Sequence, residues 1–331
     1  MKATVHLVAL AGIALAIGLI VYHGFDKVLD ALLAAGWGIL WVVLYHLVPL
    51  LFSAVGWRAL LQADWPCPLK PYVVARWIGE AVNILLPVAQ VGGDIVRGRV
   101  LTFYGATARL ATASVVVDLT LQIVTQLIFT LMGLGLLVAT GSDPEVARWA
   151  LIGVAVALPV VAGFVLAQRF GLFKLVDKML AFLEQKARWL QAGALNNLHE
   201  AVLSLYRDRR ALVSSSVYHL LSWITGAGEI WLALHFIGVE VSLAEALIIE
   251  SLSQAIRSAA FVVPGAYGVQ EGGFIALGAL FGLSPDVALA LSLIKRVRDF
   301  TLGVPALAVW QVMEGKRAWL GFGGKDGQPK P

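Results

Sequence analysis

The stretch from Tyr72 to Arg99 constrains the fold most, because it is apolar enough to enter a bilayer yet too polar to cross one as a straight helix. One proline, two adjacent glycines and several ionisable side chains interrupt it. A charge near the bilayer centre costs roughly 2.5–3.5 kcal/mol even on lenient scales. Broken backbone is tolerated at that depth only inside protein or beside a water-filled cavity. We therefore interpret the stretch as a re-entrant, broken helix that forms half of a binding site. Its candidate site residues are Glu80, Asn83, Pro87, Gly92, Gly93, Asp94 and Arg97.

The composition places the whole chain in a membrane. Of its 331 residues, 59% are hydrophobic and 14% are charged, whereas about a quarter of residues are charged in soluble domains. The net charge of +4 does not indicate a nucleic-acid partner, because Lys and Arg collect beside the apolar segments. Cys67 is the single cysteine, which excludes an intramolecular disulfide framework, and the histidines show no metal-ligand spacing. We therefore predict neither a metal site nor a cofactor.

Apolar segments long enough to cross a bilayer recur along the chain. They predict an all-α polytopic membrane protein with about eight transmembrane helices plus the re-entrant broken helix. We expect the first segment to be a retained span rather than a cleaved signal peptide. The seventh is short and rich in glycine, and re-entry is the alternative to a full crossing. The predicted spans are 5–22, 37–61, 112–139, 149–167, 212–235, 246–263, 265–283 and 287–313.

The distribution of Lys and Arg predicts the orientation. Residues 168–210 hold eight of them and should be cytoplasmic, whereas the loop 236–245 holds none and should lie outside. Within the basic region, 172–190 has the pattern of an amphipathic helix that lies on the membrane surface or packs on the protein's own cytoplasmic face. Eight crossings then place both termini in the cytoplasm of a bacterial plasma (inner) membrane. We predict one integral membrane domain over residues 1–331, made of a first half (1–168), a connector (169–210), a second half (211–313) and a short tail (314–331).

A second broken segment repeats the pattern of the first. Two aliphatic residues precede Pro264, and Glu271 stands seven positions after it, as Asp94 stands seven after Pro87. Weak similarity between two broken apolar segments is typical of transporters built from structural repeats, with the substrate site between them. Chance similarity in apolar sequence is the alternative. The candidate site residues of this segment are Arg257, Pro264, Gly265, Gly268, Gln270 and Glu271.

A basic cluster in the last predicted span completes the candidate site with Lys295, Arg296 and Arg298. Arginine can grip a lipid phosphate through paired hydrogen bonds, while the carboxylates could bind a proton, a cation or a cationic headgroup. Alternatively, all these charges pair among themselves and only fasten the helices together. Asp118 and Gln122, one turn apart, fit contacts between helices better than a site.

Two motifs resemble those of the lysylphosphatidylglycerol synthase transmembrane-region family: GEAVNILLPVAQVGGDIVR (79–97) and VPGAYGVQEGG (263–273). This family includes the flippase half of MprF and many stand-alone, flippase-like membrane proteins. Residues 116–137 are similar to the HpnL subgroup, which is associated with hopanoid biosynthesis. The family pattern has Gly-Gly-hydrophobic-Gly after the second proline, and Ala266 departs from it here.

The resemblance and the paired broken segments imply a lipid flippase or transporter for a phosphate-bearing or isoprenoid lipid, including hopanoid-related ones. One alternative is a non-catalytic membrane partner of lipid or hopanoid synthesis proteins. A less favoured alternative is an enzyme that modifies lipids within the membrane. Aminoacyl-lipid synthesis would need a large cytosolic catalytic domain, for which residues 314–331 are too few, so we expect no enzyme activity.

Overall fold

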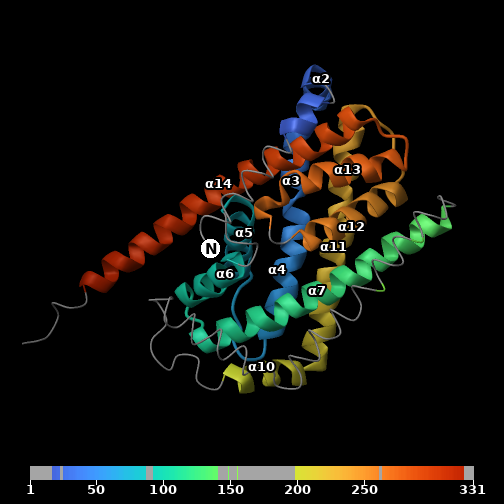
Figure 1. Cartoon of the computed structure of the whole chain (residues 1–331). Helices are drawn as coiled ribbons and strands as arrows, with labels where there is room; N and C mark the ends of the chain where they lie inside the picture. Colours follow the sequence, from blue (N-terminus) through green and yellow to red (C-terminus); the bar gives the residue numbers. More distant parts are fainter. Residues whose placement is uncertain are drawn as a thin grey trace, which may run out of the picture.

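The structure is a computed structural model that describes residues 17–22, 25–86, 92–140, 198–260 and 263–323, together with positions 148 and 155. Over these residues every regular element is a helix (Figure 1). The chain is therefore an all-α polytopic membrane protein, as predicted. The expected spans 5–22 and 149–167 lie largely outside the described residues, and the expected amphipathic helix 172–190 and Pro87 lie wholly outside them. The total of about eight spans thus stays a prediction.

Three helical stretches of the described part are long and apolar enough to cross a membrane. The first joins α3 (Gly38–Tyr45) to α4 (Leu47–Leu61), the second is α7 (Ala108–Ala139), and the third is α11 (Arg209–Ile237). They agree with the predicted spans 37–61, 112–139 and 212–235. The first is interrupted at His46, because Pro49 has no amide hydrogen and its ring crowds the carbonyl group four residues earlier.

The predicted broken segment is a helical hairpin, here called the first hairpin, made of α5 (Lys70–Leu85) and α6 (Gly92–Phe103). Their 16 and 12 residues correspond to about 24 and 18 Å, whereas a bilayer core is about 30 Å thick. The two helices touch closely where Gly79 meets Gly93: a Cβ atom on Gly93 would lie 2.0 Å from the Gly79 carbonyl oxygen. The Gly93 amide also donates a hydrogen bond to Asn83 Oδ1 (2.7 Å).

The second broken segment also forms a hairpin, here called the second hairpin. It runs from α12 (Leu243–Ala259) through the short 3-10 helix η1 (Pro264–Ala266) to α13 (Val269–Ala279). The 11 residues of α13 cover about 17 Å, too little to cross a bilayer. The structure therefore favours the re-entrant alternative for 265–283, which removes this segment from the predicted total of about eight spans. The predicted span 246–263 largely coincides with α12, the other arm of the same hairpin. Gly265 (φ 61°) and Gly268 (φ 77°) form the bend in left-handed conformations that favour glycine.

One order of elements occurs twice. A long helical stretch (α3–α4 or α11), a hairpin and a further long helix follow one another, the last being α7 in the first half and α14 (Pro285–Gly323) in the second. One arm of each hairpin is exchanged: α5 packs along α14 and α12 along α7, while α4 and α11 pack together between them (Figure 1). The other arms, α6 and α13, pack on α7 and α14 of their own halves. This arrangement supports the predicted pseudo-symmetric repeats. Two shorter helices, α2 (Phe25–Ala35) and α10 (Leu198–Arg207), pack against α14 and α7 respectively.

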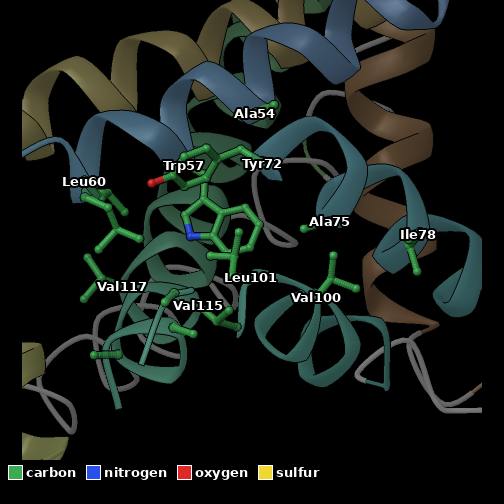
Figure 2. Packing of buried hydrophobic residues seen from close by; sticks show 14 of the residues in the cluster. Ala54, Trp57, Leu60, Tyr72, Ala75, Ile78, Val100, Leu101, Val115 and Val117 are labelled. Atoms are coloured by element: carbon green, nitrogen blue, oxygen red, sulfur yellow. The ribbon is translucent and has the colours of Figure 1, made fainter. Parts of the chain in front are cut away.

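A core of buried side chains fixes α4, α5, α6 and α7 relative to one another. Figure 2 shows Trp57 and Tyr72 at its centre, with their rings edge to face at 5.6 Å. The Trp57 indole donates a hydrogen bond to Ser114 (3.1 Å), and the Arg97 guanidinium lies 4.9 Å from the centre of the Trp57 ring. The core therefore ends directly against buried charge. Large apolar side chains such as Trp37, Trp41 and Val213 are exposed on the outside, as expected of a lipid-facing surface.

Candidate functional site

A polar cavity of about 310 Å³ lies where both hairpins meet the central pair α4 and α11. It is lined by side chains from α4, α5, α6, α7, α11, α12 and α14, so both halves of the chain contribute to it. Cavities of a few hundred Å³ between helices with convergent polar groups are typical ligand sites. The predicted site residues that line this cavity are Glu80, Asn83, Asp94, Arg97, Arg257 and Arg298.

Other predicted site residues lie beside the cavity and make structural contacts. Arg296 donates to Glu271 (3.2 Å) and to the Gly265 carbonyl (2.7 Å), and its guanidinium stacks 4.2 Å from the Tyr267 ring centre. Glu271 also accepts the Gly268 amide (2.7 Å) at the start of α13. These contacts fasten the second hairpin to α14. Gly92 begins α6, Pro264 begins η1, and Gln270 is buried with no hydrogen-bond partner for its oxygen in the described part.

Asp118, fully buried on α7, is the centre of the first charge network. Its carboxylate accepts hydrogen bonds from Arg76 of α5 (2.8 Å) and from Arg97 of α6. His219 Nε2 of α11 lies 2.8 Å from the other carboxylate oxygen, and Gln122 donates at 2.7 Å. Asp118 and Gln122 thus hold helices together as expected, but Gln122 and three of the side chains that meet Asp118 also line the cavity.

His46 is the centre of the second network. It sits at the break between α3 and α4, with Nδ1 2.6 Å from Glu229 Oε1 of α11 and Nε2 3.1 Å from Glu80 Oε1 of α5. Arg298 of α14 pairs with Glu229 and with its neighbour Asp299. The network therefore joins the first hairpin to both long helices of the second half.

The two halves place opposite charges on corresponding elements. In the first half the hairpin supplies arginines to an acid on the following long helix, as in Arg97 with Asp118. In the second half the hairpin supplies acids to bases on the following helix: Glu250 pairs with Lys295 (2.7 Å) and Glu271 with Arg296 (3.2 Å). Burial of these charges is tolerated because each has a partner.

Arg257 differs from the other cations of the cavity. It lines the cavity from α12 and has no hydrogen-bond or ion-pair partner among the described residues. Arg97 Nη2 and Arg76 Nε are also buried without a hydrogen-bond acceptor in the described part. Unsatisfied guanidinium donors beside a polar cavity suit an anion with several oxygens. The described residues form no cluster of three or more His, Cys, Asp or Glu that could hold a metal.

Besides Gln122, four residues of these networks line the cavity yet fall outside the predicted site set, namely His46, Arg76, His219 and Glu229. The two histidines do not have the sequence spacing of metal ligands, so a search for metal sites misses them. Each of the four nevertheless stands inside an apolar helix, and ionisable groups at such positions are expected to be paired and functional. That signal alone would have added them.

Comparison with known proteins finds a family that covers nearly the whole chain. The model of the family described as lysylphosphatidylglycerol synthase TM region matches residues 8–306, which include both hairpins. The chain belongs to this family. A UPF0104 membrane protein of Methanothermobacter thermautotrophicus is 26% identical over 70% of this chain and 72% of its own length. Those of Pyrococcus horikoshii (21%; 89% and 92%) and Methanocaldococcus jannaschii (23%; 86% and 88%) match over more of both chains.

Proposed function

We propose that this family member moves a phosphate-bearing lipid between the two leaflets of the bacterial plasma membrane. The observation that carries the proposal is the polar cavity between the two hairpins, into which Arg257 brings a guanidinium that has no hydrogen-bond or ion-pair partner in the described part. A headgroup would occupy the cavity while the acyl or isoprenoid chains stay in lipid. Membership of a family named for the membrane region of a lipid synthase supports a lipid as the substrate.

Phosphate fits the cavity better than an uncharged headgroup. Arg257 and the open donors of Arg97 and Arg76 can hydrogen-bond several oxygens at once. Phospholipids and isoprenoid phosphates share the phosphate group. The arginines would therefore select for a phosphate headgroup and would not discriminate between acyl and isoprenoid chains. The movement of lipid would follow from movement of the hairpins, since one arm of each, α6 or α13, is too short to cross the bilayer.

The experiment is a flip assay in proteoliposomes that contain fluorescent phosphatidylglycerol, phosphatidylcholine or a phosphate-free glycolipid. Loss of label to a membrane-impermeant quencher reports transfer between leaflets. We expect the wild type to move the phosphate-bearing lipids, and Arg257→Gln to slow them at least about tenfold, since a charge-assisted hydrogen bond contributes roughly 1.5–3 kcal/mol. Arg209→Gln, which changes an exposed arginine at the start of α11, is the matched control and should behave like the wild type. Wild-type protein that moves no lipid, or an Arg257→Gln variant at full rate, would refute the proposal.

A further inference from the structure

His46 is held between two carboxylates from different halves of the chain, Glu80 of α5 and Glu229 of α11. A neutral imidazole has one N–H donor and one acceptor nitrogen, so it can hydrogen-bond only one ionised carboxylate. Here both ring nitrogens lie within hydrogen-bond distance of a carboxylate oxygen, at 2.6 and 3.1 Å. The geometry therefore requires one additional proton, and the imidazole, which is more basic than a carboxylate in model compounds, holds it.

The charges around His46 also balance only with that proton present. Glu229 is paired with Arg298 of α14, Asp299 is paired with the same arginine, Lys295 of α14 is paired with Glu250 of α12, and Arg257 shares the cavity. With His46 doubly protonated, four cationic groups face four carboxylates; without the proton, one negative charge is left over. Uncompensated charge is costly at this depth. The four cationic groups are His46, Arg257, Lys295 and Arg298, and the four carboxylates are Glu80, Glu229, Glu250 and Asp299.

The two carboxylates differ in access to the cavity. The Glu229 side chain is 2% exposed and bonded to Arg298, whereas the Glu80 side chain is 33% exposed and has the longer contact with His46. When the proton leaves, one ring nitrogen of His46 becomes an acceptor and can no longer hydrogen-bond a carboxylate oxygen. We expect the longer contact, to Glu80, to be the one that opens. Glu80 belongs to the first hairpin, so its release frees α5 from the α3–α4 break.

We propose that His46 and Glu80 form the binding site of a proton that couples to lipid movement; this coupling rests on the proposed function. The protonated state clamps the first hairpin against α3, α4 and α11. Loss of the proton to the cavity opens the His46–Glu80 contact, and the hairpin then moves relative to the central helices. The break between α3 and α4, which Pro49 causes, places His46 where its ring reaches both acids.

The proton site is tested directly by nitrogen NMR of the protein in lipid nanodiscs with ¹⁵N-labelled histidine. We expect one imidazole with hydrogen on both ring nitrogens at neutral pH, assigned to His46 by its loss in His46→Gln. Glu80→Gln removes one carboxylate and should convert that signal to a neutral ring. His235→Gln, at a histidine whose side chain is 49% exposed, is the matched control and should leave the signal unchanged. A neutral His46 in the wild type, or an imidazolium that survives Glu80→Gln, overturns the proposal.

The coupling is tested in the flip assay with and without a pH difference across the vesicle membrane. We expect the gradient to change the wild-type rate and to have no effect on Glu80→Gln. A wild-type rate that ignores the gradient refutes the coupling. If no lipid moves under any condition, the proposed function fails and the coupling fails with it, whereas the NMR spectrum still decides whether the proton site exists.

Discussion

Asp118 shows how single residues hold this molecule together. It is fully buried and gathers side chains from α5, α6, α7 and α11. A buried ion pair adds little net stability compared with apolar packing, but removal of one partner leaves an uncompensated charge. The residues around Asp118 are therefore far less tolerant of change than exposed charged residues.

We expect Asp118→Asn to destabilise the protein by about 3–5 kcal/mol, because Arg76 and Arg97 would both lose their shared counterion. The measurement is thermal unfolding in detergent, followed by tryptophan fluorescence. Glu240→Gln is the control, since the Glu240 side chain is 83% exposed and its contact with His235 is long (3.4 Å). Such an exposed pair contributes at most about 1 kcal/mol. Equal melting temperatures for the two variants would contradict this view of Asp118.

At the scale of elements, close packing between glycines shapes the first hairpin. Gly79 and Gly93 let α5 and α6 approach until their backbones touch, and the Asn83 side chain bonds the first turn of α6. This explains the glycine at position 93. The two glycines serve the packing of two short helices, and Gly79 also lines the cavity.

Gly93→Ala should splay the hairpin, because the new Cβ atom would lie 2.0 Å from the Gly79 carbonyl oxygen. We expect a large loss of folded protein by size-exclusion chromatography and a lower melting temperature. Gly135→Ala in α7 is the matched control: nothing lies within 4 Å of its Cβ position. Alanine favours a helix over glycine by about 1 kcal/mol, so that variant should be unchanged or slightly more stable. A Gly93→Ala protein as stable as wild type would disprove the close packing.

The sequence predicts the helices better than it predicts which charged side chains pair with one another. Pro87 and Gly92 indicate the first break, and apolar length indicates α7 and α11, because both signals are local. The partner of a charge is not local: Arg97 pairs with Asp118, and Glu229 pairs with Arg298, 69 positions away. The spacing of Glu271 after Pro264 predicted a site residue, yet its carboxylate holds the bend of its own hairpin. Only the packing of the helices decides which charges face the cavity.

At the scale of the whole molecule, the two halves complement one another in sign and exchange one arm of each hairpin. The α5 arm rests on α14 and the α12 arm on α7, whereas α6 and α13 pack within their own halves, so the cavity exists only where both halves are assembled. Orientation in the membrane remains a prediction from Lys and Arg bias. It places the segment between α4 and α5 in the cytoplasm.

Cys67 lies in that segment and provides the test of orientation. A membrane-impermeant maleimide should label it from the cytoplasmic side only. Burial raises the pKa of the Cys67 thiol, and the thiolate is the reactive form. Labelling should therefore be slow at neutral pH and speed up as the pH rises. In a Cys67→Ser background, Glu240→Cys should react from the outside only. The opposite sidedness at either position would reverse the predicted topology.

The exchange of hairpins sets an order of events during synthesis. The first hairpin ends at Phe103 and α14 begins at Pro285, so roughly 180 residues separate the end of this hairpin from the helix that covers its α5 arm. At about 5–20 residues per second, the ribosome takes roughly 10–40 s to supply α14. Early in that interval Glu80 can reach His46 before Glu229 has been synthesised, and Arg298 follows only with α14. The nascent chain must therefore keep a charged, half-covered hairpin at the membrane insertion machinery until its last long helix arrives.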